Sequence, residues 1–275
     1  MPFITRPDGA ELYWEERGAG PDVVIANQFF APLDVFQGLL DLVAAQHRLI
    51  TYDPRGIGES SPHGPYDLAT DAEDLAALID EACDGAVLIA AMGDGCNRAT
   101  HVAADRPELV HAVLCVSGNP VSRVAGAGGE GLAASDSVIE ALLAMMDTDY
   151  RGALRTMIGT ANPNLDDDAV RERVSASVER CPQAAAAPRM RSWIEDEAVR
   201  PARAVGERLW ILEDGSNPWF LETSQRTVEL LPEAHVEAVE NGAVSRPDIA
   251  ASYVSRITGV GDRAVGAAED SKGRA

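Results

Sequence analysis

Residues 86–105 read AVLIAAMGDGCNRATHVAAD: an apolar run, a glycine-rich turn and then a helical pattern. The apolar run predicts a strand over 86–91 that is buried on both faces, and the helix is expected from about Cys96 to Asp105. A buried strand that turns directly into a helix is the unit from which parallel sheets covered by helices are built. The segment therefore predicts an α/β fold.

The same alternation of strands and helices extends in both directions from this segment. Strands are expected at 11–16, 22–26, 47–52, 111–117, 208–212 and 235–239, with helices at 33–46, 67–83, 223–231 and 248–257. Between 120 and 201 the strand pattern is lost, and helices are expected over 137–146, 166–178 and 189–199. We predict a mostly parallel sheet flanked by helices, with a helical cap inserted after the sixth strand. The core is expected at 1–119 and 202–259, the cap at 120–201 and a disordered tail at 260–275.

Charge excludes several kinds of partner. The 275 residues include 23 Lys and Arg against 44 Asp and Glu, a net charge of −21. Such a chain repels phosphate backbones and anionic lipid, so we predict no nucleic-acid and no membrane partner. The one lysine, Lys272, lies close to the C-terminus, which argues against Schiff-base chemistry and a phosphate-loop lysine.

Targeting signals and cysteine pairs are also missing from the sequence. The start of the chain has no basic region followed by an apolar run, and the longest apolar stretch is too short to cross a bilayer. The four cysteines form no C-x-x-C pair, so neither disulfides nor a metal site is indicated. We predict a cytoplasmic protein without metal or cofactor, and assembly into a homo-oligomer stays open.

Two motifs carry a resemblance to a known family. Residues 52–60 read YDPRGIGES, which matches a D-x-R-G-x-G-x-S turn after the fourth strand, and residues 88–110 contain the strand, turn and helix described above. Together and in this order they resemble the α/β-hydrolase superfamily, in its capped branch, over about residues 8–259. In that family a tight strand-to-helix turn presents the catalytic nucleophile.

The resemblance implies positions for a catalytic triad. The nucleophile position falls on Gly93, the acid position on Asn217 before Pro218, and the base position on Ala243. None of these residues can do the work of Ser, Asp and His, which implies a degenerate triad. A register shifted by one would make Asp94 the nucleophile, but it would put the bulky Met92 where the turn needs a small residue.

Other groups near the turn keep chemistry open. The oxyanion loop of the family corresponds to Asn27, Gln28 and Phe29, and backbone N–H donors are expected at Phe29 and Asp94. Asp94 is either a helix cap or a general base that orients substrate, and the helix N-terminus is expected to keep it ionised. Of the five histidines, only His63 follows a strand on a loop that could approach the site.

The predicted ligand is a small, largely apolar molecule with carbonyl or hydroxyl groups. The side chains expected to line its pocket are amides and aromatics: Asn27, Gln28, Phe29, Asn119, Trp193 and Trp219. The G-x-G at Gly93 is too short to predict a dinucleotide site, and Asp166–Asp168 fit an acidic first helical turn better than a metal site.

Three functions remain open. The first is lyase, isomerase or cyclisation-type chemistry assisted by Asp94, without a covalent serine route. The second is a non-catalytic protein that binds a small molecule or a partner. The third is a hydrolase with an atypical nucleophile, Asp94 or Cys96. Whether the chain is an enzyme is not decided by the sequence.

Overall fold

The computed structural model describes residues 3–121, 136–162, 165–216 and 218–260. Its eight-stranded sheet has the order β1-β2-β4-β3-β5-β6-β7-β8, in which β2 pairs antiparallel with both β1 and β4, and the six strands β3–β8 run parallel to one another. The strands are β1 (Phe3–Thr5), β2 (Glu11–Arg17), β3 (Asp22–Ala26), β4 (Arg48–Tyr52), β5 (Val87–Met92), β6 (Val110–Ser117), β7 (Leu209–Asp214) and β8 (His235–Val239). The predicted mostly parallel sheet is confirmed, and β1 is the strand that the pattern missed.

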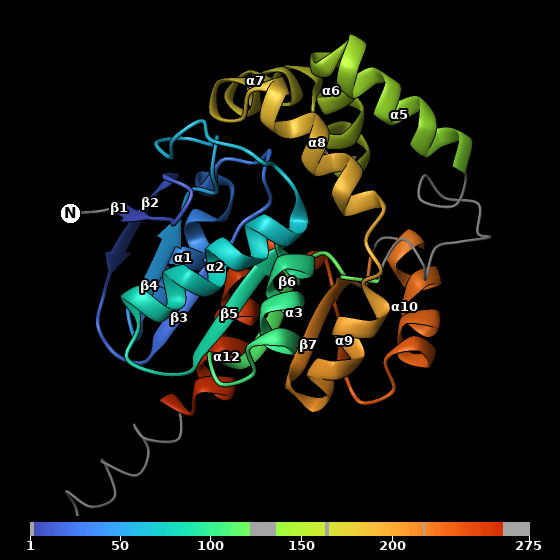
Figure 1. The fold of residues 1–275 in the computed structure, drawn as a ribbon. Helices are drawn as coiled ribbons and strands as arrows, with labels where there is room; N and C mark the ends of the chain where they lie inside the picture. The colour runs from blue at the N-terminus through green and yellow to red at the C-terminus, as the bar shows by residue number, and fades with distance from the viewer. Residues whose placement is uncertain (1–2, 122–135, 163–164, 217, 261–275) are drawn as a thin grey trace, which may run out of the picture.

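Helices cover both faces of the sheet (Figure 1). One face carries α2 (Leu68–Ala82), α3 (Gly95–Asp105) and α9 (Val199–Val205), and the other carries α1 (Gln37–Ala44) and α12 (Pro247–Thr258). Shorter or peripheral elements are η1 (Leu33–Phe36), η2 (Gly206–Arg208), α10 (Pro218–Leu230) and α11 (Gly242–Ser245). Each face has its own buried apolar cluster, so the sheet forms the middle layer of a three-layer core.

The strand β5 lies near the centre of the sheet. All six of its residues are buried, and β3 and β6 pair with it on its two sides in parallel. A continuous apolar run is what a strand covered on both faces requires. The sequence prediction for 86–91 is therefore confirmed, and the turn that follows β5 lies at the carboxyl edge of the sheet.

Four helices follow β6 and precede β7: α5 (Asp136–Thr148), α6 (Tyr150–Ala161), α7 (Asp167–Arg180) and α8 (Gln183–Ile194). They share a third apolar cluster and stand together beyond one edge of the sheet (Figure 1). Asp166 caps α7 by accepting a hydrogen bond from the backbone N–H of Ala169 at 2.8 Å, so its assignment to a helix start is confirmed.

Buried ion pairs tie these helices to the core. Arg189 of α8 lies 2.6 Å from Asp71 of α2, and each side chain is only 2% exposed. Arg180, the last residue of α7, pairs with Asp53, whose carboxylate also accepts a hydrogen bond from the N–H of Glu59 at 3.0 Å. The D-x-R-G-x-G-x-S turn thus serves as an anchor for the helices between β6 and β7.

The helix expected over 189–199 is divided in two. α8 ends at Ile194 and α9 begins at Val199, where it packs against α3. Between them Asp196 accepts hydrogen bonds from Asn97 and His101 at 2.8 Å each, which draws the connecting segment onto α3. The tail predicted at 260–275 lies outside the described residues apart from Val260. No helix in the described ranges is both long and apolar enough to cross a membrane.

Candidate functional site

The turn between β5 and α3 forms the centre of the site. Gly93 has a φ of +54°, and its N–H donates to the carbonyl of Ser117 at 2.6 Å. A Cβ on Gly95 would lie 1.9 Å from the carbonyl oxygen of Ala26, so only glycine lets α3 start this close to β3. The positive φ at Gly93 and the close approach at Gly95 give the geometry of a nucleophile elbow.

The side chain of Gln28 fills the space above Gly93. A Cβ on Gly93 would lie 2.7 Å from Cβ of Gln28 and 2.8 Å from its Oε1, both too short for real contacts. Gly118 closes the other side, since a Cβ there would lie 3.0 Å from the nitrogen of Gly93. Gln28, Gly93 and Gly118 are all partly exposed. Among the residues that the structure describes, these three form the bottom of the site.

Asp94 turns its carboxylate toward the loop after β3. Its Oδ1 accepts a hydrogen bond from the backbone N–H of Phe29 at 2.9 Å, and its Oδ2 lies 3.2 Å from the guanidinium of Arg98. Asp94 stands at the N-cap position of α3, but its side chain makes no capping hydrogen bond. The interpretation of Asp94 as a simple helix cap is therefore wrong, because Phe29 and Arg98 hold the carboxylate away from the free N–H groups of α3.

Burial dominates the electrostatics of Asp94. The side chain is buried, which raises the pKa of its carboxyl above the ordinary value, while the charge of Arg98 and the N–H of Phe29 act in the opposite direction. The expectation that the helix N-terminus keeps Asp94 ionised stays a prediction, and burial shifts the pKa of this carboxyl in the direction opposite to it.

Arg98 contacts the carboxylate of Asp94 and also links it to Asn27 in the loop after β3. Arg98 is fully buried, donates to the hydroxyl of Tyr52 at 3.2 Å and also donates to the carbonyl of Asn27. The amide of Asn27 donates to the carbonyl of Ala31 at 2.8 Å, while its Oδ1 and the Nε of Arg98 have no partner in the described part of the chain. Asn27 therefore shapes the loop and does not present its amide to the floor of the site.

The position that the resemblance assigns to the base is apolar. Ala243, in α11, is 2% exposed and belongs to the same apolar cluster as Met92. Its neighbour Gly242 lies against Asp214 at the end of β7, where a Cβ on Gly242 would be 3.2 Å from the carboxyl carbon. Asn217 lies outside the described residues, and so does the side chain of Trp219.

Asn119 belongs to a separate buried cluster. Its amide donates to Glu213 at 2.9 Å and to the hydroxyl of Thr227 at 2.7 Å, while its Oδ1 accepts from the N–H of Val121. Glu213 is 3% exposed, its Oε2 has no partner among the described residues, and burial raises its pKa to about 7. Sequence reasoning missed Glu213, although it follows Leu209 and Ile211 at the alternating spacing that points side chains to one face.

Trp193 lies on α8 and connects the helices between β6 and β7 to α3. Its Nε1–H donates to Oδ1 of Asn97 at 3.0 Å, and Asn97 in turn donates to the carbonyl of Pro120 at 3.2 Å. Trp193 is partly buried against the third apolar cluster. The structure thus brings Gln28, Phe29 and Asp94 together at Gly93. Trp193 reaches α3 from α8 and contacts it at Asn97, about one helical turn beyond Asp94.

Cys96 follows the elbow but is not exposed to it. Its thiol is fully buried beside Cys115, and burial raises its pKa well above the ordinary value. A thiol in this state is a poor nucleophile, because the thiolate is the reactive form. Within the described ranges, no group of His, Cys, Asp or Glu has an arrangement that could hold a metal ion.

Comparison with known proteins agrees with this geometry. The alpha/beta hydrolase fold family matches residues 21–193, which is more than half of the chain. The chain belongs to the alpha/beta hydrolase fold family. The matched range contains the elbow and the loop after β3. It ends before β7 and β8, the strands that precede the acid and base positions of an alpha/beta hydrolase.

Named relatives match over short segments. The probable oxidoreductase EphD of Mycobacterium tuberculosis is 34% identical over 88 residues, which are 30% of this chain and 15% of that protein. The non-heme haloperoxidase of Rhodococcus erythropolis is 34% identical over 82 residues, 29% of this chain and 30% of that protein. The chain thus covers well under two thirds of these relatives, and they carry the family likeness only.

Solved alpha/beta hydrolase structures match nearly the whole fold. The esterase EaEST of Exiguobacterium antarcticum superposes with a TM-score of 0.74 at 19% identity, covering 92% of this chain and 98% of that one. E-2-(acetamidomethylene)succinate hydrolase gives a TM-score of 0.69 at 22% identity, covering 93% and 98%. At these identities the likeness concerns the fold.

Proposed function

We propose that this chain binds a small, largely apolar, oxygenated molecule above Gly93 and does not hydrolyse it through a covalent intermediate. The observation that carries the proposal is the contact between Gly93 and Gln28. The elbow position has no side chain, and the Gln28 side chain fills the space that a nucleophile would need. Gln28 is partly exposed, and its amide is a hydrogen-bonding group suited to a hydroxyl or carbonyl of a ligand.

The contact of Asp94 with Phe29 supports the same proposal. Hydrolysis by an alpha/beta hydrolase needs the N–H groups of Phe29 and Asp94 to bind a developing oxyanion. The carboxylate of Asp94 already accepts from the N–H of Phe29. A carboxylate at this place also repels a second negative oxygen.

The positions of the histidines support it further. A serine-type mechanism needs a base within about 3 Å of the attacking hydroxyl. None of the hydrogen bonds and ring contacts within the described ranges joins a histidine to Gly93 or Asp94. The recorded partners are Thr258 for His47, Asp196 for His101, Ile257 for His111 and Trp210 for His235, and His63 is exposed with its carbonyl near Arg55.

Two measurements test the proposal. A fluorophosphonate probe should leave the purified chain unlabelled, and p-nitrophenyl acetate and butyrate should be hydrolysed no faster than by the heat-unfolded chain. A thermal-shift screen of lactones, ketones and alcohols should find compounds that raise the melting temperature without being converted. Stoichiometric labelling at one residue together with ester turnover would contradict the proposal.

The second candidate is proton-transfer chemistry by Asp94, of the lyase, isomerase or cyclisation type. The buried position of Asp94, which raises the pKa of its carboxyl above the ordinary value, favours it, because groups with a pKa perturbed by burial are common among general acids and bases. The discriminating variant is Asp94→Asn. If a bound compound is converted and Asp94→Asn abolishes conversion while retaining binding, this second candidate replaces the first.

The remaining predictions stand as proposals. An atypical nucleophile is the weakest of them, because Cys96 is buried and Asp94 is held by Phe29 and Arg98. Mass spectrometry of the chain during ester turnover would detect an adduct on either residue. We keep the cap assignment of α5–α8 and the cytoplasmic location as proposals as well.

A further inference from the structure

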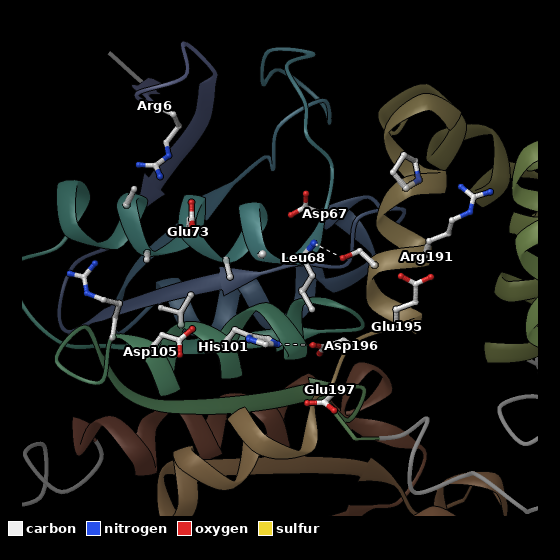
Figure 2. A pocket seen from close by; sticks show the side chains of 18 of the residues that line it. Arg6, Asp67, Leu68, Glu73, His101, Asp105, Arg191, Glu195, Asp196 and Glu197 are labelled. Atoms are coloured by element: carbon white, nitrogen blue, oxygen red, sulfur yellow. Dashed lines mark hydrogen bonds and ion pairs between the residues drawn. The ribbon is translucent and has the colours of Figure 1, made fainter.

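Polar groups at the contacts between elements are generally paired within the described ranges. Figure 2 shows one example in the groove between α2, α3 and the end of α8, where Asp196 lies 2.8 Å from His101. Glu213, near the end of β7, is different. Its side chain is buried, yet its Oε2 has no hydrogen-bond partner in the part of the chain that the structure describes. Such an oxygen is costly in the ionised carboxylate, which accepts several hydrogen bonds in water.

The carboxyl of Glu213 belongs to a cluster of side chains from three segments. Its Oε1 accepts a hydrogen bond from Asn119, in the segment after β6, at 2.9 Å. The same amide donates to the hydroxyl of Thr227 on α10 at 2.7 Å, and this hydroxyl donates to the carbonyl of Thr223 at 2.9 Å. We call Glu213, Asn119 and Thr227 the Glu213 cluster. It joins α10 to the carboxyl ends of β6 and β7, and Oε2 is its one polar side-chain atom without a partner among the described residues.

The titratable and charged groups around the cluster leave Glu213 without an ionic partner. On the elements around β7 the described ones are Asp214 of β7, His111 and Cys115 of β6, His235 and Glu237 of β8, Arg200 and Arg203 of α9, and Arg226 and Glu229 of α10. Within the described ranges, none of them forms an ion pair or a side-chain hydrogen bond with Glu213. Burial raises the pKa of Glu213 to about 7, and the hydrogen bond from Asn119 opposes this shift. The closed cluster therefore favours the neutral acid.

Polar contacts hold the described part of α10 on the sheet. The side chains described in this helix are those of residues 223–230, and the two that are fully buried are Thr223 and Thr227. Leu230 is half-buried, and Val228 is exposed. Segments that bury few apolar side chains belong to the parts of a fold that open locally at low cost. The hydrogen bonds of the Glu213 cluster are thus a main contact of this part of α10 with β7.

We propose that ionisation of Glu213 releases α10 from the end of β7. While Glu213 is protonated, the cluster is neutral and α10 stays on the sheet. When the proton leaves to solvent, the carboxylate needs hydrogen-bond donors at Oε2, and water reaches this buried oxygen only if α10 moves away. The contact between α10 and β7 is therefore closed at low pH and opens as pH rises past neutrality. This pH-dependent opening goes beyond the proposed function and requires no ligand.

The size of the effect follows from the two protonation equilibria of Glu213. In the closed cluster its pKa is about 7, and in contact with water the pKa returns to the ordinary value of 4.5. The hydrated carboxyl is ionised at both pH 6 and pH 8, whereas the closed one loses its proton between them. Linkage then makes the open fraction of α10 rise about tenfold from pH 6 to pH 8.

Amide hydrogen exchange at pH 6 and pH 8 tests the proposal in the wild-type chain. Protection factors relate each observed exchange rate to the intrinsic rate at the same pH. We expect α10 to be less protected than α12 at both pH values, and its protection to fall about tenfold from pH 6 to pH 8. Urea at 1 M should hardly change the protection of α10, because a local opening exposes little surface. Equal protection and equal urea dependence in the two helices would mean that Glu213 is hydrated only on global unfolding, which overturns the proposal.

Two variants assign the pH dependence to Glu213. Glu213→Gln keeps an acceptor for Asn119 but has no proton to lose, so the protection of α10 should be equal at pH 6 and pH 8 within about twofold. Glu229→Gln is the matched control, since it removes an exposed carboxylate from the same helix, and it should keep the tenfold fall. A tenfold fall that persists in Glu213→Gln would overturn the assignment. The wild-type comparison decides the matter by itself if Glu213→Gln does not fold.

Discussion

The carboxylate of Asp94 accepts the backbone N–H of Phe29 at 2.9 Å, across 65 residues of sequence. In an alpha/beta hydrolase the N–H at the position of Phe29 is one of the two oxyanion donors. The chain therefore places a carboxylate of its own where a reacting oxygen would bind. A carboxylate is also the group that ester hydrolysis releases, so this N–H makes the kind of hydrogen bond that it could make to a carboxylate product.

Removing this carboxylate should create a site for a free one. In Asp94→Ala the N–H of Phe29 and the buried Arg98 lose their partner, and we expect a loss of about 3–5 kcal/mol in the free energy of unfolding. Acetate at 100 mM should then raise the melting temperature of the variant by a few degrees and that of the wild type much less.

Two controls accompany the acetate experiment. Sodium chloride at equal ionic strength should not reproduce the shift. The double variant Asp94→Ala, Arg98→Met should lose most of it, because the guanidinium that lies 3.2 Å from the carboxylate is removed. An acetate response that is equal in wild type and Asp94→Ala would show that Asp94 does not occupy the anion site.

Restoring a serine at the elbow should fail unless Gln28 is changed too. Gly93→Ser puts a Cβ within 2.8 Å of the Gln28 side chain and forces a positive φ on serine. We expect it to destabilise the fold by about 1–3 kcal/mol. In the background Gln28→Gly the same change should cost less, and urea unfolding of the four proteins gives the coupling. Additive effects would contradict the contact.

Much of the fold follows from local sequence pattern. The apolar run before Gly93 predicts β5, and Asp166 predicts the start of α7, because both signals involve neighbours in sequence. The same reasoning predicted one helix over 189–199, which fails because Asp196 bonds to residues of α3. Local pattern cannot anticipate a partner that is a hundred residues away.

The site is less predictable than the fold, for the same reason. Gly93 and Asp94 were identified from the motif, but the contact with Phe29 depends on how the loop after β3 lies over the elbow. The sequence pattern could have predicted that Glu213 is buried, since it follows Leu209 and Ile211 at every second position of a strand. Its unpaired oxygen depends on Asn119 and α10, which only the packed structure brings together.

Glu213 should make stability fall between about pH 4.5 and 7. Burial raises its pKa from 4.5 to about 7, so the folded chain keeps a proton that the unfolded chain releases. The stabilising contribution is complete below pH 4.5 and is lost as pH rises through 7, for a total of up to about 3 kcal/mol. Glu213→Gln should remove this slope and be the more stable protein at pH 8.

Urea unfolding at pH 5 and pH 8 measures the slope. The exposed Glu229→Gln, which changes charge on the neighbouring α10, should keep the pH dependence of the wild type. If Glu213→Gln retains it as well, Glu213 titrates normally in the folded chain.

The ion pair of Asp71 with Arg189 should hold α8 on the core. Removing one partner leaves the other charge buried without compensation, so Arg189→Met and Asp71→Asn should each cost about 3–5 kcal/mol. The double variant should be more stable than either single variant, since no lone charge remains. Thermal unfolding reports stability, and limited proteolysis reports release of α8. Single variants within 0.5 kcal/mol of wild type would contradict this role.

The positive φ of Gly93 has an evolutionary consequence. A residue with a side chain at such a turn carries strain of about 1–3 kcal/mol, and an enzyme retains it because its chemistry needs the side chain there. Glycine adopts the same backbone without strain. Under the proposed function, the elbow of this chain is free of the trade-off between stability and activity, so substitutions around it can accumulate for tighter packing alone.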